Sequence, residues 1–182
     1  MSIVLSAPER AAVEHDRTAF HIAVWNKVVA DPDLARLPYR IETDKHGQLI
    51  MSPPPAPEHG EHQVEIAVLL RQLIPGGKTM TECPISTQQG IKAADVAWAS
   101  HEIRESGRGL ACLPKCPEIC VEILSPSNTK SEIDEKIAAY FDSGAKEVWI
   151  CEEDGTMRFL EGFEKPINVS ALCPKFPQAI EA

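Results

Sequence analysis

A chain of 182 residues that is 43% hydrophobic and 25% charged has the size and composition of one soluble domain with a sizeable core. This balance excludes disordered and collagen-like proteins, and no run approaches the ~20 apolar residues of a membrane-spanning helix. The net charge of -9 argues against a broad nucleic-acid-binding surface, although it leaves room for a local basic groove. The first residues lack the pattern of a secretory signal, so we expect a cytoplasmic protein.

The six cysteines suggest either buried thiols or a zinc site. Three of them recur at intervals of four residues, whereas zinc ligands usually come as two closely spaced pairs. We therefore expect free thiols buried in a reducing compartment. The six are Cys83, Cys112, Cys116, Cys120, Cys151 and Cys173.

The N-terminal segment begins with a helix signal, in which Ser6 acts as N-cap and Pro8 lies in the first turn. This helix should end by Asp31-Pro32. We interpret residues 1–36 as a helical extension that acts as a lid or a dimer contact, and residues 37–182 as the main domain. His21, within the helix, is expected to pack or to face solvent.

A hairpin should follow, with strands at 39–43 and 48–51 and with Gly47 supplying a positive φ in the turn. The next residues, 52–57, contain four prolines and predict a stiff extended connector.

Residues 58–73 predict a helix whose apolar positions recur at helical spacing. At ~100° per residue, His59 and His62 fall on the same buried face and Glu65 falls at its edge. Two alternatives remain for the histidines: they line a pocket where helix and sheet diverge, or they cap the core and meet solvent.

Alternating residues predict the central strands. Strands at 85–90 and 91–98 place Asp95 and Ala97 on one face of the second strand. In residues 119–124, the β-branched side chains point one way and Glu122 points the other. A carboxylate in mid-strand requires a cation or hydrogen bonds. A structural ion pair, or a strand half open to water, is the simpler explanation.

A helix that ends before Gly144 should follow, capped by Thr129 with Glu132 or by Ser131 with Asp134. Lys136 lies at the side of its apolar face, so the ammonium can reach the adjoining sheet. An exposed pair with Glu132 is the alternative.

Residues 147–151 and 156–160 should form a final hairpin, followed by an irregular tail.

Asp95, Glu122 and Lys136 form the main candidate site. If the two strands are neighbours with both carboxylates on one face, the repulsion between the acids is relieved by a hard divalent cation, Mg²⁺ or Mn²⁺. Such an ion activates water and stabilises charge on a phosphoryl oxygen, and a nearby lysine can orient the water.

Several motifs along about residues 37–160 resemble the Uma-two family of restriction-endonuclease-like proteins, a branch of the PD-(D/E)XK nuclease superfamily. The block around Glu122 is the most specific of them. The motifs are Met51-Ser52-Pro53-Pro54-Pro55, His59-Gly60, Ala94-Asp95-Val96-Ala97-Trp98, the block Pro117–Ser127, Lys136 with Tyr140, and Gly144–Ile150.

The resemblance implies an α/β fold with a mixed sheet flanked by helices, and an Mg²⁺-dependent endonuclease acting on nucleic acid, with DNA as the expected substrate. By resemblance Asp95 and Glu122 hold the metal, with the main-chain carbonyl of Ile123 as a further ligand. The superfamily lysine normally stands two residues after the glutamate, where this chain has Leu124. Lys136 is its expected replacement.

His59 and Glu65 are expected to line the site. A homodimer is expected because one site per chain must cut two strands, and two-fold symmetry achieves this.

Two rival functions remain open. The first is a catalytically silent member of the same fold that binds nucleic acid or protein, which the acidic composition favours. The second is a metal-independent hydrolase, for instance of glycosides, that uses Asp95 and Glu122 as an acid/base pair.

Overall fold

The computed structural model of the chain describes residues 7–180, with side chains described from Asp16 onward. It is an α/β fold containing a two-stranded sheet and a mixed six-stranded sheet of order β3-β4-β5-β6-β7-β8. The elements are α1 (Ala7–Ala30), η1 (Leu34–Arg36), β1 (Arg40–Thr43), β2 (Leu49–Ser52), α2 (Pro57–Leu73), β3 (Gly77–Thr87), β4 (Gly90–Ser100), α3 (His101–Ser106), β5 (Ile119–Ile123), α4 (Lys130–Asp142), β6 (Glu147–Cys151), β7 (Met157–Leu160) and β8 (Pro166–Ile167).

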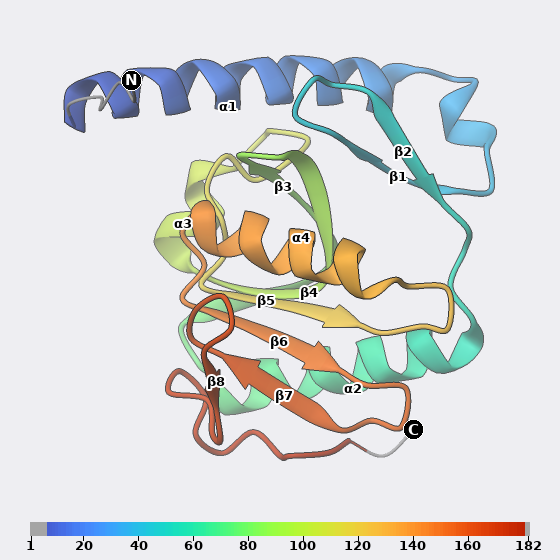
Figure 1. Cartoon of the computed structure of the whole chain (residues 1–182), viewed down its shortest axis with the longest axis vertical. Helices are drawn as coiled ribbons and strands as arrows, with labels where there is room; N and C mark the ends of the chain where they lie inside the picture. Colours follow the sequence, from blue (N-terminus) through green and yellow to red (C-terminus); the bar gives the residue numbers. More distant parts are fainter. Residues whose placement is uncertain (1–6, 181–182) are drawn as a thin grey trace.

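The large sheet has a helix on each face, with α4 in front and α2 behind in Figure 1. On the α2 side, Ile66 and Leu70 pack against Val121 of β5 and Trp149 of β6. On the α4 side, the core contains Ile133, Ile137 and Tyr140 with Cys120 and Ile150. Alternate residues of β5 therefore serve two separate cores, as the period of two predicts. The mixed sheet flanked by helices confirms the expected fold class.

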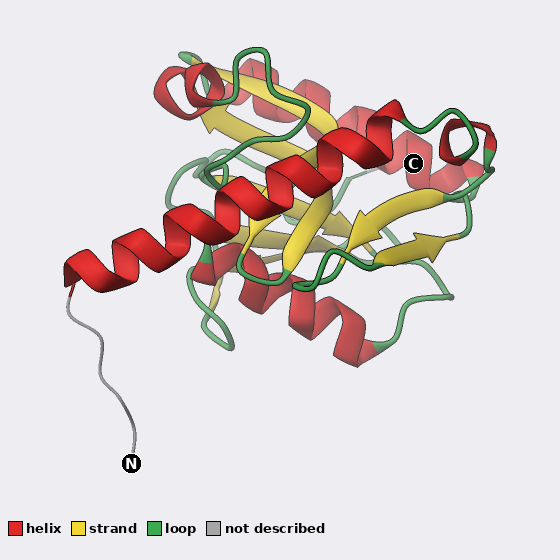
Figure 2. Cartoon of the chain, turned by 90° about the horizontal axis from the view of Figure 1, so that it is seen from above, coloured by secondary structure: helices red, strands yellow, loops and turns green. Residues whose placement is uncertain are grey.

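The helix α1 and the β1–β2 hairpin cover one end of the domain. Trp25 of α1 packs against Ile91 of β4, with Ile41 of the hairpin beside them. Figure 2 shows α1 crossing over the strands as one long helix. The predicted end near Asp31-Pro32 is confirmed, while the proposed N-cap at Ser6 lies outside the described residues. The division at residue 36 stays a prediction.

Several local predictions are confirmed. Gly47 has φ 80° in the hairpin turn, and a Cβ there would come within 3.1 Å of Val24 in α1. Thr129 and Glu132 form the capping box of α4, the first of the two alternatives for that helix start. His21 is buried in the helix–hairpin contact, and desolvation lowers its pKa. All six cysteines are buried and free.

Two strand predictions need correction. The strand predicted to begin at Ile85 begins at Gly77, because residues 77–87 pair with the whole length of β4. Gly77 permits this pairing beside Trp98, whose ring lies 2.4 Å from where a Cβ would be. The tail, expected to be irregular, adds the short strand β8 at the edge of the sheet. Within residues 7–180, no helix is long and apolar enough to cross a membrane.

Candidate active site

Strand pairing brings Asp95 and Glu122 to one face of the sheet. Strands β4 and β5 are antiparallel, with Ala97 opposite Cys120 and Val96 opposite Val121. One further step of this register places Asp95 opposite Glu122, and their side chains point to the same face because residue pairs in a ladder share a face. Both residues are buried, with 1% and 2% exposure. The backbone N–H of Ile123 donates to Asp95 Oδ2 at 2.7 Å.

The hairpin supplies a cation to Asp95. Arg40 of β1 donates from Nη1 to Asp95 Oδ1 at 2.6 Å, and its Nη2 donates to the carbonyl of Ala93. Its Nε lies 3.1 Å from Glu82 Oε2. One guanidinium thus bridges β4 and β3, and it is held by a buried carboxylate of the predicted site.

The helix α4 supplies a cation to Glu122. Lys136 Nζ lies 2.6 Å from Glu122 Oε2 and donates to the carbonyl of Ala93 at 3.2 Å. The hydroxyl of Tyr140, one turn further along, donates to Glu122 Oε1 at 2.6 Å. The lysine lies beside the sheet, as the helical projection predicted, and Glu132 is engaged in the capping box instead.

Two further carboxylates surround this pair. Glu42 of β1 lies 3.2 Å from Lys136 Nζ and accepts the backbone N–H of Ala93 at 2.9 Å. Glu82 of β3, between the paired residues Thr81 and Cys83, has φ 47°. This left-handed conformation is costly for a residue with a Cβ, and such strain is concentrated at functional sites. The acidic cluster, as we call it, consists of Glu42, Glu82, Asp95 and Glu122 with the cations Arg40 and Lys136.

The helix α2 contributes His59, whose Nε2 lies 3.4 Å from Asp95 Oδ2. Its Nδ1 is buried without a hydrogen-bond partner among the described residues. Glu65 is exposed on the same helix, and no hydrogen bond or ion pair joins it to the cluster in the described part of the chain. Gln63 reaches the cluster instead, donating to the Asp95 carbonyl at 2.7 Å and to Glu82 at 2.9 Å. His62 is buried with the apolar residues of the helix.

The two central acids differ in their protonation behaviour. Burial opposes ionisation of Asp95, but the hydrogen bond from His59 and the charges of Arg40 and Lys136 hold its pKa well below the usual range. Burial raises the pKa of Glu122 to about 7 against the opposing effect of Lys136, and the charge of Asp95 raises it further. Glu122 therefore titrates near neutrality, whereas Asp95 is an anion.

The groups that donate to these acids keep their protons. Desolvation would lower the pKa values of Arg40 and Lys136, but the surrounding carboxylates raise both overall. Burial, together with the charge of Glu122, raises the pKa of Tyr140. At neutral pH the cluster therefore contains two fixed cations and a neutral phenol.

Comparison with known proteins assigns the chain to a family. Residues 31–170 match the family described as "Uma2: Putative restriction endonuclease". The chain belongs to the Uma2 family. No curated protein matches it. Among solved structures it is similar to a protein from Anabaena variabilis, described as a "putative nuclease belonging to DUF820", with a TM-score of 0.64 and 15% identity, over 80% of this chain and 91% of that one. This likeness supports the fold.

Restriction-endonuclease-like proteins generally use a divalent metal. The residues of the acidic cluster can be compared with what such an ion requires. Among the described residues, no group of three or more His, Cys, Asp or Glu side chains is arranged to hold an ion. Mg²⁺ in proteins is, however, commonly held by one or two carboxylates, with water and substrate phosphates completing its shell. The buried oxygens of Asp95 and Glu122 fit that requirement, and Arg40 and Lys136 now occupy them.

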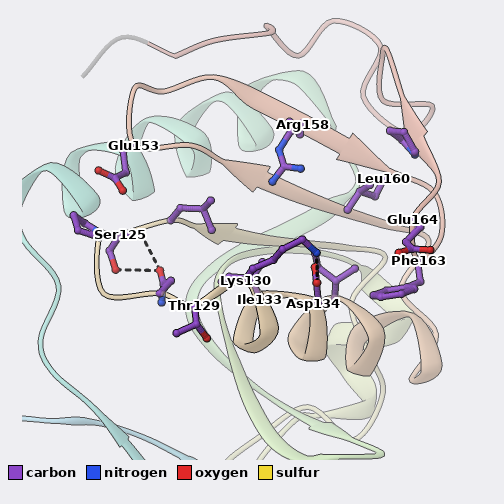
Figure 3. Close-up of a pocket in the computed structure, with 15 residues that line it drawn as sticks. Ser125, Thr129, Lys130, Ile133, Asp134, Glu153, Arg158, Leu160, Phe163 and Glu164 are labelled. Atoms are coloured by element: carbon purple, nitrogen blue, oxygen red, sulfur yellow. Dashed lines mark hydrogen bonds and ion pairs between the residues drawn. The ribbon is translucent and has the colours of Figure 1, made fainter.

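A well-defined pocket of this Uma2-family chain lies at a different site. It has a volume of about 490 Å³ and lies between α4 and the β7–β8 edge (Figure 3). Its apolar lining includes Ile133, Ile137 and Phe163, while Lys130 and Arg158 line it with charge. Neither Asp95 nor Glu122 lines it, although Leu124, just beyond β5, does. The helix α4 thus has the acidic cluster on one side and this pocket on the other.

Sequence reasoning missed Arg40, Glu42, Gln63 and Glu82. The first two carried a usable signal, since residues 40 and 42 of a strand share a face and bear opposite charges. Gln63 lies one helical turn after His59 and points to the same side. Glu82 carried no such signal, because its side-chain direction depends on a left-handed backbone that a glutamate rarely adopts.

Proposed function

We propose that this chain is a divalent-metal-dependent endonuclease that hydrolyses nucleic-acid phosphodiester bonds, with DNA as the expected substrate. One observation carries the proposal: two buried carboxylates on adjacent strands share a face with the ammonium of Lys136, 2.6 Å from Glu122. Membership of the Uma2 family and the likeness to a nuclease-described structure support the same activity.

The metal would be held by Asp95 and Glu122, with Mg²⁺ or Mn²⁺ as the expected ion. When bound, such an ion would supply Lewis acidity that activates water and offsets charge on the phosphoryl oxygens. Asp95 is suited to this role because it is an anion at every physiological pH, as its lowered pKa indicates. Tyr140 fixes the orientation of Glu122 through its hydrogen bond to Oε1.

Lys136 would act as a cation. Its raised pKa keeps the ammonium protonated, so it is suited to orient a water molecule or to neutralise developing negative charge. It is poorly suited to remove a proton. His59 lies beside Asp95 and would line the substrate side of the site, whereas Glu65, exposed on α2, would meet only a substrate that extends beyond the cluster. A homodimer would place two such sites on the two strands of a duplex.

Nicking of a supercoiled plasmid in Mg²⁺ or Mn²⁺ tests this proposal. Asp95→Ala should reduce nicking about a thousand-fold, equivalent to ~4 kcal/mol of transition-state stabilisation. Asp134→Ala, which removes an acid on the pocket side of α4, is the matched control and should leave the rate unchanged. Equal nicking by wild type and Asp95→Ala would reject the assignment.

One observation favours a second candidate, the catalytically silent binding module. All four carboxylate oxygens of Asp95 and Glu122 lie near donors from the protein itself. A cluster neutralised in this way can be stable without a metal. Calorimetric titration separates the two candidates, because a silent module with both acids intact would bind no Mn²⁺.

A further inference from the structure

Arg40 occupies the position where a divalent cation would meet Asp95. Asp95 Oδ2 already accepts the N–H of Ile123 and faces His59. The remaining oxygen, Oδ1, is the one that Arg40 Nη1 contacts at 2.6 Å. The other amino group of the guanidinium binds the Ala93 carbonyl, a hard oxygen on the same strand. The guanidinium therefore covers the one Asp95 oxygen that does not already accept a backbone N–H, together with a second hard oxygen beside it.

A metal and this guanidinium exclude one another at Oδ1. An Mg²⁺ ion binds oxygen at about 2.1 Å, and a fixed positive charge against the same oxygen would repel it strongly in a buried site. Metal binding to Asp95 therefore requires the end of the Arg40 side chain to move.

The structure offers that side chain a second partner. Glu82 Oε2 lies 3.1 Å from Arg40 Nε, and its side chain is 48% exposed, compared with 1% for Asp95. Nε is buried and makes no hydrogen bond among the described residues, so its contact with Glu82 is an ion pair without a formed hydrogen bond. Gln63 holds the other oxygen of Glu82 at 2.9 Å.

The backbone at Glu82 is arranged for this contact. Its φ of 47° occurs within β3 at the residue opposite Asp95, between the pairs Thr81–Val96 and Cys83–Ala94. A left-handed glutamate in mid-strand is strained and persists only where surrounding contacts hold it. The ladder pairs on either side hold this backbone, and the Glu82 carboxylate contacts Arg40 and Gln63, both of which also bind Asp95.

We propose that Arg40 is a displaceable substitute for the metal: it neutralises Asp95 in the metal-free protein and transfers to Glu82 when a divalent cation enters. The inference rests on the proposed function, since it concerns the same site. Arg40 is a gating residue here, and Glu82 acts through it without binding the metal. Metal affinity is consequently lower than the two acids alone would give.

Mn²⁺ calorimetry on the full chain tests the inference, because it predicts whether each variant gains or loses Mn²⁺ affinity. Arg40→Ala should bind Mn²⁺ about ten-fold more tightly than wild type, because competition at Asp95 is lost. Arg40→Lys should fall between them, since lysine keeps the charge and loses the forked geometry. Glu82→Gln should weaken binding several-fold, because the displaced guanidinium then lacks its acceptor.

The double variant separates Glu82 as acceptor from Glu82 as metal ligand. In the Arg40→Ala background, Glu82→Gln should leave Mn²⁺ affinity unchanged. An equal loss of Mn²⁺ affinity on Glu82→Gln in both backgrounds would overturn the inference, because Glu82 would then be a metal ligand. Weaker Mn²⁺ binding by Arg40→Ala than by wild type would also overturn it, because Arg40 would then support the metal site. Thermal melting in EDTA identifies any variant that does not fold, and in that case the Arg40→Lys titration decides.

Failure of the proposed function gives a different result. If folded wild type and folded Arg40→Ala both bind no Mn²⁺, the metal-dependent activity is rejected together with the gate. If both bind with equal affinity, the gate is rejected and the metal site remains.

Discussion

The two sides of α4 differ in kind, because one lines an open pocket and the other holds a buried carboxylate of the proposed site. On one side, Ile133 and Ile137 face an open pocket of about 490 Å³ whose lining charges are near the surface. On the other side, Lys136 and Tyr140 bind Glu122, which is 2% exposed. Pocket volume measures unfilled space, whereas reactivity follows from charges held away from water.

The largest effect on stability is expected from the buried acid Glu122. Its pKa of about 7 exceeds the ordinary value of 4.5, so between these pH values the folded protein keeps a proton that the unfolded chain has released. Stability of the metal-free protein from this residue is therefore highest below pH 4.5 and is lost as pH rises through 7, by roughly 3 kcal/mol in all.

Urea unfolding of wild type and Glu122→Gln in EDTA, from pH 4.5 to 8, measures this contribution. The wild-type free energy of unfolding, taken relative to that of the variant, should fall across the range. The subtraction removes other titrating groups such as His21. A flat difference would show that Glu122 ionises normally in the folded state.

Two lysines on α4 provide the next comparison. Lys136→Met should lower the rate of plasmid nicking about a hundred-fold, or ~3 kcal/mol, because in the proposed function it removes a fixed cation that would lie beside the reacting phosphate. Lys130→Met, on the pocket side and paired with Asp134 at the surface, should leave the rate nearly unchanged. Similar losses in both variants would mean that the helix contributes general positive charge, and the contrast between its two sides would fail.

The smallest effect is expected from the phenol. Tyr140→Phe removes the 2.6 Å hydrogen bond to Glu122 and leaves a buried acceptor without its donor, at a cost of about 1–3 kcal/mol in stability. Tyr39→Phe, at an exposed position, is the control and should be neutral. The denaturant midpoints of both variants are measured at pH 8 and compared with that of wild type. A Tyr140→Phe midpoint equal to that of wild type would show that the phenol contributes only packing.

The same contrast explains what could be predicted from the sequence. The positions of Asp95 and Glu122 on the sheet could be predicted because strand residues alternate between faces. The position of Lys136 could be predicted because helix geometry fixes its angle relative to Ile133 and Ile137. The capping box of Thr129 and Glu132 is likewise a local pattern.

The remaining features depend on contacts between segments distant in the chain. Arg40 meets Asp95 only because the hairpin folds onto β4, and 55 residues separate them. Glu82 has a left-handed backbone conformation, which is strained. The conformational preferences of glutamate do not predict it. The pocket forms between α4 and β8, a strand too short to give any period.

A crystal soaked in Mn²⁺, with the ion located by its anomalous scattering, tests the central claim most directly. We predict one ion within about 2.2 Å of oxygens from both Asp95 and Glu122. An ion bound elsewhere, with Asp95 still held by Arg40 and Glu122 still held by Lys136, would contradict the account.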